Sequence, residues 1–351
     1  MTDKTSQGAM PVPDAVPVPV PEAVAIPPGQ AGYLVRVAAR APSLHNTQPW
    51  RFKIGPDAIE LYADYSRQLE TDPIGRELLI SCGAALYGLR LAVRSLNRTP
   101  EVELFGEPAI PPAAKTRLRL LARVRLGASA PMTAVERKML EAVPHRHTHR
   151  GPFDPAPLPA GLLTGLQHDA TTEGATLAVI DPQHAARALT PILTAASREQ
   201  DLDPVSRAEI LRWTRNASSL ARDGVPAHAF PAQPDRNPGP LPQRDFDLGR
   251  GLGLLAAGGP PAMVTAVLVT AGDAEEDWLR AGQALNRLLL HAASQWVFAR
   301  LQTQPLQAGT IRALIETRLA LPGVPQMLLE FGVARIAPAT GRRPAADLAE
   351  A

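Results

Sequence analysis

The chain has little of several features that define specialised protein classes. It holds one cysteine, Cys82, in 351 residues, which excludes an intrachain disulfide framework and fits a reducing compartment. The apolar neighbours of Cys82 predict a buried, inert thiol. The formal net charge is only +2, and no block of five or six like charges occurs. Charge therefore gives no support to a nucleic-acid or membrane-surface role.

A membrane-spanning segment and a secretory signal are also missing. The most apolar long stretch, residues 288–301, is interrupted by His291, Gln295 and Arg300. Residues 1–10 are polar, and the apolar residues after them are broken by prolines. We therefore expect a cytoplasmic protein with no membrane partner.

Prolines are concentrated near the N-terminus. Residues 11–29 alternate proline with small apolar residues, a pattern that favours polyproline II and prevents a helix or a central strand. We predict that residues 1–29 form a disordered or surface-draped arm.

Beyond the arm, helical and strand patterns interleave, which predicts an α/β or α+β protein with layers of both. Hydrophobic residues make up 45% of the chain and charged residues 20%, ordinary values for a soluble globular protein. The patterns predict helices at about 30–41, 75–96, 158–168, 183–199, 204–216 and 274–301, and strands at 50–54, 58–64, 102–105, 116–126, 176–180, 262–270 and 325–336.

The second half of the chain echoes the first. A shift of 199 residues gives seven identities between 77–95 and 276–294, including Glu77 with Glu276 and Gly83 with Gly282. A shift of 176 residues gives four more between 36–44 and 212–220: Arg36 with Arg212, Ala41 with Ala217, Ser43 with Ser219, and Leu44 with Leu220.

The two shifts differ by 23 residues, so the second copy carries an insertion. It falls in the proline- and glycine-rich stretch 221–260. A loop of this length inside a compact protein is usually functional, and we expect a lid; the alternative is a disordered insertion.

The sharpest motif, residues 41–50, reads Ala-Pro-Ser-Leu-His-Asn-Thr-Gln-Pro-Trp and follows a predicted helix. The side chains of Asn46 and Gln48 each offer a donor and an acceptor, the chemistry needed to bind the edge of a flat heterocycle. The alternative is a turn-and-cap segment, where Ser and Asn are common. The motif closely resembles the flavin-ring-binding Ala-Pro-Ser-x-x-Asn-x-Gln-Pro-Trp of the nitroreductase family. The resemblance implies that the ring of FMN contacts Ser43, Asn46, Gln48 and Trp50.

A second motif places Arg146, Thr148 and Arg150 within five residues, a natural phosphate clamp. It resembles the Arg-x-Ser/Thr-x-x-Arg phosphate-binding element of nitroreductases, although the Arg-x-Thr-x-Arg spacing is compressed and leaves the role of Arg150 less certain. Two alternatives are a solvated basic loop and a metal site on His145, His147 and His149. Because the cluster itself contains no carboxylate or cysteine and the arginines repel a cation, we expect no metal ligands.

A third element, Gly-Arg-Arg-Pro at 341–344, resembles the basic residue that follows the last strand of nitroreductases and reaches the FMN phosphate. The resemblance implies a contact from Arg342. The alternative is a charged tail.

The two binding elements are divided between the repeated halves. The counterpart of the ring motif in the second half, residues 217–226, has Arg222, Gly224 and Pro226 in place of Asn46, Gln48 and Trp50. This pattern resembles the Acg-like branch of the nitroreductase family, in which one chain imitates the usual homodimer. The resemblance implies an α+β nitroreductase-like fold of two fused half-copies, residues 30–144 and 145–345, and a monomer with one complete site.

The resemblance also implies a function. We expect an FMN-dependent oxidoreductase that uses NAD(P)H to reduce a nitroaromatic or quinone-like small molecule. The cofactor supplies the hydride chemistry, so no side chain is assigned as a catalytic acid, base or nucleophile. One alternative is a flavin-sequestering protein whose lid prevents turnover, and another is a degenerate scaffold with an empty pocket.

Overall fold

The computed structural model describes residues 24–106, 117–232, 241, 243–254, 262–335 and 340–350. Within them, two mainly antiparallel sheets have the strand orders β11-β1-β2-β4-β3 and β5-β8-β10-β9. The strands of the first sheet are β1 (Trp50–Ile54), β2 (Ala58–Asp64), β3 (Arg98–Leu104), β4 (Leu118–Ser129) and β11 (Ala349–Glu350). Those of the second are β5 (Thr176–Ile180), β8 (Met263–Thr270), β9 (Val297–Gln302) and β10 (Val324–Val333). The α+β class is confirmed.

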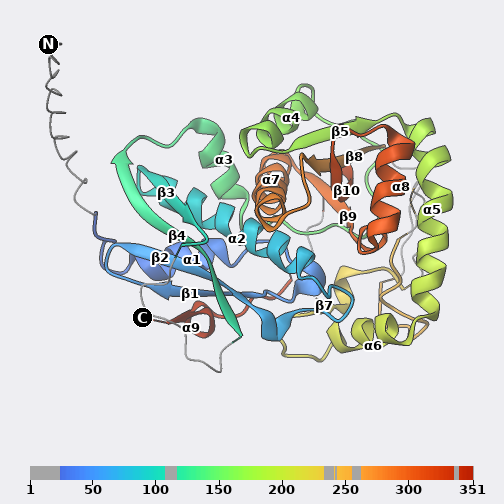
Figure 1. Cartoon of the computed structure of the whole chain (residues 1–351), viewed down its shortest axis with the longest axis horizontal. Coiled ribbons are helices and arrows are strands. Elements are labelled where there is room, and N and C mark those ends of the chain that lie inside the picture. Colours follow the sequence, from blue (N-terminus) through green and yellow to red (C-terminus); the bar gives the residue numbers. More distant parts are fainter. Residues whose placement is uncertain are drawn as a thin grey trace, which may run out of the picture.

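Helices separate and cover the sheets. They are α1 (Gln30–Ala38), α2 (Arg76–Ser95), α3 (Ala134–Ala142), α4 (Leu162–Thr172), α5 (Pro182–Leu202), α6 (Pro204–Trp213), α7 (Glu275–Ala293), α8 (Gly309–Leu319) and α9 (Ala345–Leu348). A short ladder, β6 (Thr214–Arg215) with β7 (Val225–Pro226), follows α6. Figure 1 shows α2 and α7 side by side between the two sheets, with α5 and α8 covering the second sheet.

The two sheets share one topology. Reading β1 as the equivalent of β5, β2 of β8, β3 of β9 and β4 of β10 makes their strand orders identical. The long helix connects equivalent strands in both, α2 between β2 and β3, and α7 between β8 and β9. One difference is that β5 precedes α5 and α6, whereas β1 follows α1. The shared topology is what the predicted duplication implies, and the exact division into half-copies stays a prediction.

The core is centred on the α2–α7 contact. A Cβ atom added at Gly83 would collide with the carbonyl oxygen of Leu279, and one added at Gly282 would collide with that of Ile80. These glycines are the pair that the shift of 199 aligns, so the repeat preserves a close helix crossing. Helix α2 is long and apolar enough to cross a membrane by length and composition, but 83% of its apolar window is buried inside the fold.

One predicted helix was too long. The expected helix at 274–301 ends as α7 at Ala293, and residues 297–302 form β9 instead. Trp296 adopts φ +57°, in the left-handed region, which ends the helical path and turns the chain into pairing with β10. Helices α3 and α8 were not predicted. Helix α3 does carry a sequence signal, a capping box between Thr133 and Glu136.

The two ends of the chain both meet the first sheet. Val24 bridges to Leu126 of β4, and the amide of Ile26 donates to the carbonyl of Pro56. Residues 1–23 of the predicted arm lie outside the described residues. The last strand, β11, pairs in parallel with β1, so residues beyond the predicted second half add a strand to the sheet of the first half.

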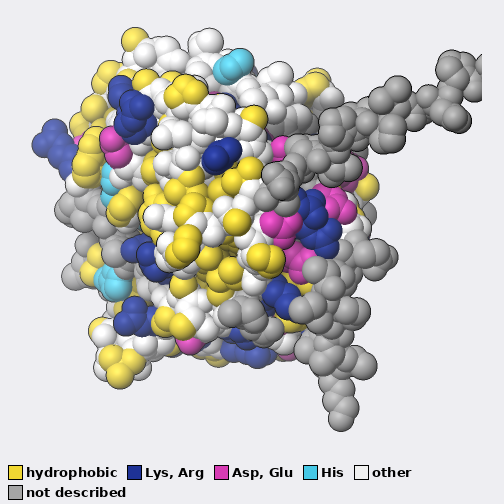
Figure 2. Space-filling view, turned by 90° about the vertical axis from the view of Figure 1, so that its left-hand side faces the viewer, with side chains coloured by type: hydrophobic (Ala, Val, Ile, Leu, Met, Phe, Trp, Pro, Cys, Tyr) yellow, Lys and Arg dark blue, Asp and Glu magenta, His cyan; other side chains and the backbone are white. Residues whose placement is uncertain are grey.

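Figure 2 shows the face of the molecule at the end where the first sheet lies. Hydrophobic side chains gather at its centre, and acidic and basic side chains lie next to one another beside them. Ion pairs of this kind in the first sheet join Arg123 to Glu60 and to Glu103. On the described part of this face the charges are therefore mixed rather than of one sign.

Candidate functional site

The ring motif forms a strained turn between α1 and β1. His45, Asn46 and Gln48 have φ values of +50°, +55° and +51°, in the left-handed region that residues other than glycine rarely adopt. Each such residue costs on the order of 1–3 kcal/mol and is typical of functional sites. The amide of Gln48 donates to Ser43 Oγ at 2.9 Å, and the amide of Leu44 donates to Ser81 Oγ of α2 at 3.4 Å, which hold the turn in place.

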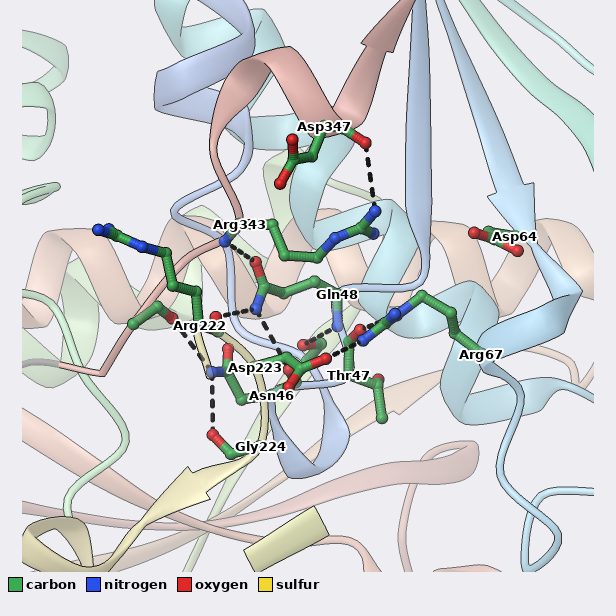
Figure 3. Close-up of polar contacts among 12 residues, drawn as sticks. Asn46, Thr47, Gln48, Asp64, Arg67, Arg222, Asp223, Gly224, Arg343 and Asp347 are labelled. Atoms are coloured by element: carbon green, nitrogen blue, oxygen red, sulfur yellow. Dashed lines mark hydrogen bonds and ion pairs between the residues drawn. The ribbon is translucent and has the colours of Figure 1, made fainter. Parts of the chain in front are cut away.

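The two amide side chains of the motif, those of Asn46 and Gln48, bind backbone groups (Figure 3). Gln48 is fully buried; its Nε2 donates to the carbonyl of Arg222 at 2.8 Å, and its Oε1 accepts from the amide of Arg343 at 2.8 Å. Asn46 Nδ2 donates to the carbonyls of Gly224 and Gly341 at 3.0 and 3.1 Å. The turn is thus tied to two segments of the second half.

Trp50 and Gln48 were predicted to contact the ring, and that contact stays a prediction. Trp50 is the first residue of β1 and is completely buried in the main hydrophobic core. Neither Gln48 nor Trp50 lines any of three cavities beside the clamp and the ring motif. Both instead support the turn that presents Ser43 and His45.

The clamp segment runs beside strand β9. Thr148 forms a parallel bridge to Ala299, and the amide of His149 donates to the carbonyl of Ala299 at 2.9 Å. The amide of Arg146 donates to the carbonyl of Ala142 at the end of α3. Strand β9 and helix α3 thus fix the clamp from two sides.

A small basic cavity, of about 320 Å³, lies where the clamp meets the ring motif. Arg146, Thr148, Arg150 and Arg342 line it together with Ser43 and Asn46. An adjoining cavity of about 270 Å³ adds Arg40 beside Arg146 and Arg342. No carboxylate lines either cavity among the described residues.

Arg146, Arg150 and Arg342 are buried in these cavities, and burial lowers the pKa of each. Burial lowers the pKa of Arg146 to about 10, with a further contribution from Arg40. Burial also lowers the pKa of Arg150 to about 10. The pKa of Arg342 is lowered first by burial and then by the charges of Arg146 and Arg40. Arg146 Nη1 and Arg342 Nε are buried and have no hydrogen-bond partner. Such a donor set fits an anion with several oxygens, as a phosphate has.

A larger cavity, of about 970 Å³ including its mouth, shares Ser43, Thr148 and Arg150 with the small one. Apolar side chains of α2, α7, β9 and β10 form part of its wall: Ile80, Leu285, Leu301 and Met327. The two cavities form a basic end and a wider, partly apolar end.

Part of the predicted lid covers the larger cavity. Pro231, Gln243, Arg244 and Phe246, from the proline- and glycine-rich insertion, line it. The Phe246 ring lies 5.6 Å from the His45 ring, and the Arg150 guanidinium lies over Phe246 at 5.1 Å. The insertion therefore contacts both the ring motif and the clamp. Residues 233–240, 242 and 255–261 of this stretch lie outside the described residues.

Buried titratable groups border the cavities: Glu77 and His149 line the larger one, and His147 lines the cavity that contains Arg40. Burial, together with Asp72, raises the pKa of Glu77 to about 7. Burial lowers the pKa values of His147 and His149 to about 4, so both imidazoles are neutral at pH 7. Their ring nitrogens bond to backbone: His147 Nδ1 to the carbonyl of His145, and His149 Nε2 to that of Pro152. The described residues contain no group of three or more possible metal ligands.

The structure thus brings together six of the eight predicted site residues, which are Ser43, Asn46, Arg146, Thr148, Arg150 and Arg342. Sequence reasoning missed several residues that line the cavities, namely Arg40, His45, Glu77, Arg244, Phe246 and Arg300. The sequence did give a positional signal for two of them, since Arg40 directly precedes the ring motif and His45 lies within it. Glu77 had stood out only as a repeat position matching Glu276.

The chain is similar along most of its length to sequences from Mycobacterium tuberculosis. It is 32% identical over 327 residues to the Mycobacterium tuberculosis protein named "Putative NAD(P)H nitroreductase Rv3131", covering 90% of each chain. It is 30% identical over 321 residues to that organism's "Putative NAD(P)H nitroreductase acg", covering 88% of this chain and 92% of that one. No protein-family model matches.

Solved structures with a similar arrangement are much more distant. The FMN-dependent nitroreductase NfnB from Mycobacterium smegmatis, solved in complex with NADPH, is 14% identical, with a TM-score of 0.34 over 58% of this chain and 95% of that chain. A nitroreductase structure from Anabaena variabilis is 12% identical, with a TM-score of 0.41 over 79% of this chain and 69% of that chain.

Proposed function

This chain belongs to the nitroreductase family, and from that premise we propose that it binds one FMN and uses NAD(P)H to reduce small electron-poor compounds. The substrates expected from this chemistry are nitroaromatics and quinone-like molecules. We also propose that the protein is a monomer, since one chain supplies both the ring motif and the clamp.

The observation that carries the proposal is the pair of connected cavities. Arg146 and Arg342 have buried nitrogens that lack partners, so the basic end is incomplete without an oxyanion. The wider end begins at Ser43 and Arg150, which line both cavities. A molecule with a phosphate at one end and a flat ring at the other matches a basic cavity that adjoins a wider, partly apolar cavity.

The chain's residues would bind and orient the cofactor. Arg146, Thr148 and Arg342 would hold the phosphate, and Arg150 lies where phosphate and ring surfaces meet. Bound FMN supplies the hydride-transfer chemistry. The apolar wall and the loop bearing Phe246 would limit water near the ring. No side chain is assigned as acid or base by this arrangement.

A second candidate function is flavin sequestration. It is favoured by the insertion, because Phe246 contacts His45 of the ring motif and Arg150 of the clamp and so narrows access to the larger cavity. A loop that stays closed would exclude both NAD(P)H and substrate.

The first test is the cofactor content of the purified protein. We expect a yellow monomer with one FMN per chain of 37.4 kDa, measured by absorbance and light scattering. A colourless protein that also fails to take up added FMN would support an empty scaffold and overturn the proposal. A stable dimer would overturn the assignment of a complete site to one chain.

The second test separates an enzyme from a flavin store. The yellow protein is mixed with NADPH without oxygen in a stopped-flow instrument, and flavin bleaching is followed at about 450 nm. A matched variant replaces residues 233–253 by two glycines, because Ala232 and Leu254 already pair through a 2.8 Å backbone hydrogen bond. Bleaching of the full-length protein supports the enzyme. Bleaching of the deletion variant alone supports sequestration by the loop, and bleaching of neither removes the enzyme hypothesis.

A further inference from the structure

We propose that Arg244, on the insertion loop, binds an anionic group of the molecule that enters the larger cavity beside the flavin. The ligand class is a compact apolar or aromatic molecule with a carboxylate or a phosphate. This inference rests on the proposed function for the identity of the cavity, and it adds the class of substrate.

The guanidinium of Arg244 is buried, and among the described residues it has neither a hydrogen-bond partner nor a carboxylate at ion-pair distance. Its Nε, Nη1 and Nη2 atoms are inaccessible to solvent and have no hydrogen-bond partner. Within the described part of the chain, no carboxylate lies within ion-pair distance of it. Burial lowers the pKa of this arginine, while more distant acids such as Glu209 and Glu77 raise it. An uncompensated buried cation is costly, so a ligand anion here would relieve a large desolvation penalty.

The nearby acids are already engaged by other groups. Glu209 accepts hydrogen bonds from the amide of Glu70 at 2.7 Å and from Thr71 Oγ1 at 2.6 Å. Glu77 accepts from Gln307 Nε2 at 3.3 Å and lies 3.8 Å from a nitrogen of Arg76. One oxygen of Glu77, Oε1, is buried without a hydrogen-bond partner, but neither carboxylate lies within ion-pair distance of Arg244. The donors of Arg244 are therefore left for another partner.

The loop that carries Arg244 has a defined structure. The carboxylate of Asp247 accepts from the amides of Gly251, Leu252 and Gly253 at 2.7–2.9 Å. The carboxylate of Asp245 accepts from two further amides, those of Asp247 and Leu248. Phe246 packs against Phe230 and His45. The arginine is therefore presented from an ordered base, which reduces the entropic cost of binding through it.

The position of Arg244 separates it from the phosphate clamp. It lines the larger cavity and neither of the two basic ones, whereas Arg150 lines both ends. The wall beside it is apolar, formed in part by Ile80, Leu285 and Met327. A guanidinium beside an apolar wall suits a flat molecule with an anionic end, because the planar fork of arginine matches the two oxygens of a carboxylate.

The anion has two possible sources: a carboxylated or phosphorylated substrate, or the phosphates of the nicotinamide dinucleotide. Both have the oxyanion chemistry that Arg244 would recognise. The experiment therefore needs one arm for each source.

The test uses 4-nitrobenzoate and 4-nitrobenzamide, which differ in charge but little in shape. Their dissociation constants for the FMN-loaded protein are measured by calorimetry, which needs no turnover. We expect the wild type to bind the anion at least tenfold more tightly than the amide. Arg244→Gln should remove this preference, while Arg187→Gln, at an exposed position of α5, should retain it.

The second arm measures the dependence of flavin bleaching on NADPH concentration. One combination of results would assign the anion to the dinucleotide. In it, the wild type shows no preference for nitrobenzoate, and Arg244→Gln raises the half-saturating NADPH concentration tenfold. The inference is wrong if the wild type shows no nitrobenzoate preference and Arg244→Gln leaves the half-saturating NADPH concentration unchanged. It is also wrong if Arg244→Gln retains FMN and keeps both the nitrobenzoate preference and the NADPH requirement of the wild type. A protein without FMN, or one that NADPH does not bleach, would instead contradict the proposed function.

Discussion

Single residues of the ring motif divide into those that line the cavities and those that hold the turn. Ser43 and His45 line the larger cavity, whereas Gln48 and Trp50 are buried behind it. The amide chemistry of Gln48 was predicted correctly as multiple hydrogen bonding, but its partners were not. Those partners, Arg222 and Arg343, are 174 and 295 residues away, and a side-chain amide suits a flavin edge and a backbone carbonyl equally well.

The phosphate clamp gives the most direct prediction at this scale. Arg146→Ala should weaken FMN binding at least tenfold, because a buried charge-assisted hydrogen bond to a phosphate contributes roughly 1.5–3 kcal/mol. Fluorescence titration of the apoprotein with FMN measures the effect. Arg137→Ala, at an exposed position of α3, is the matched control and should leave the affinity unchanged. Equal affinities for both variants would show that the phosphate lies elsewhere.

Among the elements, the sequence determined the strands and long helices well where local pattern sufficed. Strands β1 and β2 match the predicted ranges residue for residue, and α2 differs by one residue at each end. The boundary between α7 and β9 was missed, because apolar residues continue through both and only pairing with β10 distinguishes them. Helix α8 lies in the second half between β9 and β10, where no helix joins the corresponding strands β3 and β4 among the described residues.

The crossing of α2 and α7 predicts a strong effect of a small change. Gly282→Ala should destabilise the protein by about 3 kcal/mol or move the helices apart, because the added methyl group collides with the backbone of Ile80. Urea unfolding followed by circular dichroism measures the free energy of unfolding.

The control for this substitution is Gly32→Ala in α1. A Cβ atom there would meet only the end of the Arg36 side chain, at 3.4 Å. We expect no loss of stability, since alanine has the higher helix propensity by about 1 kcal/mol. A loss as large as that of Gly282→Ala would refute the importance of the crossing.

For the whole molecule, segments 43–50 and 146–150, which were predicted to share one site, both contribute residues to the small basic cavity. The sequence alone could not show how much the C-terminal segment contributes. Residues 341–343 contact Asn46 and Gln48, and this contact depends on β11 joining the first sheet. Strand pairing over almost 300 residues of separation leaves no local signature.

Unfolding of the whole molecule should depend on pH through buried histidine. His147 has a pKa of about 4 when folded and near 6.5 when unfolded, so the unfolded state binds more protons between these values. Its contribution is complete above pH 6.5 and is lost as the pH falls toward 4. Burial raises the pKa values of Glu77 and Glu330 to about 7, so these groups change the free energy of unfolding with pH in the opposite direction. The contribution of His147 must therefore be measured as a difference between the wild type and a variant that lacks this histidine.

We therefore expect the wild type to lose roughly 2 kcal/mol more than His147→Gln between pH 7 and pH 5. Urea unfolding of the two proteins at both pH values gives this difference. His168→Gln, at an exposed position of α4, should behave like the wild type. Parallel pH curves for the wild type and His147→Gln would mean that this imidazole is protonated in the folded protein.

The pairing of β11 with β1 has a consequence for biosynthesis. Arg342 follows in the chain all the other residues that line the small basic cavity, and Arg343, which anchors Gln48, comes directly after it. During synthesis the basic cavity therefore cannot assemble until residues 342 and 343 have left the ribosome, long after the ring motif and the clamp have emerged.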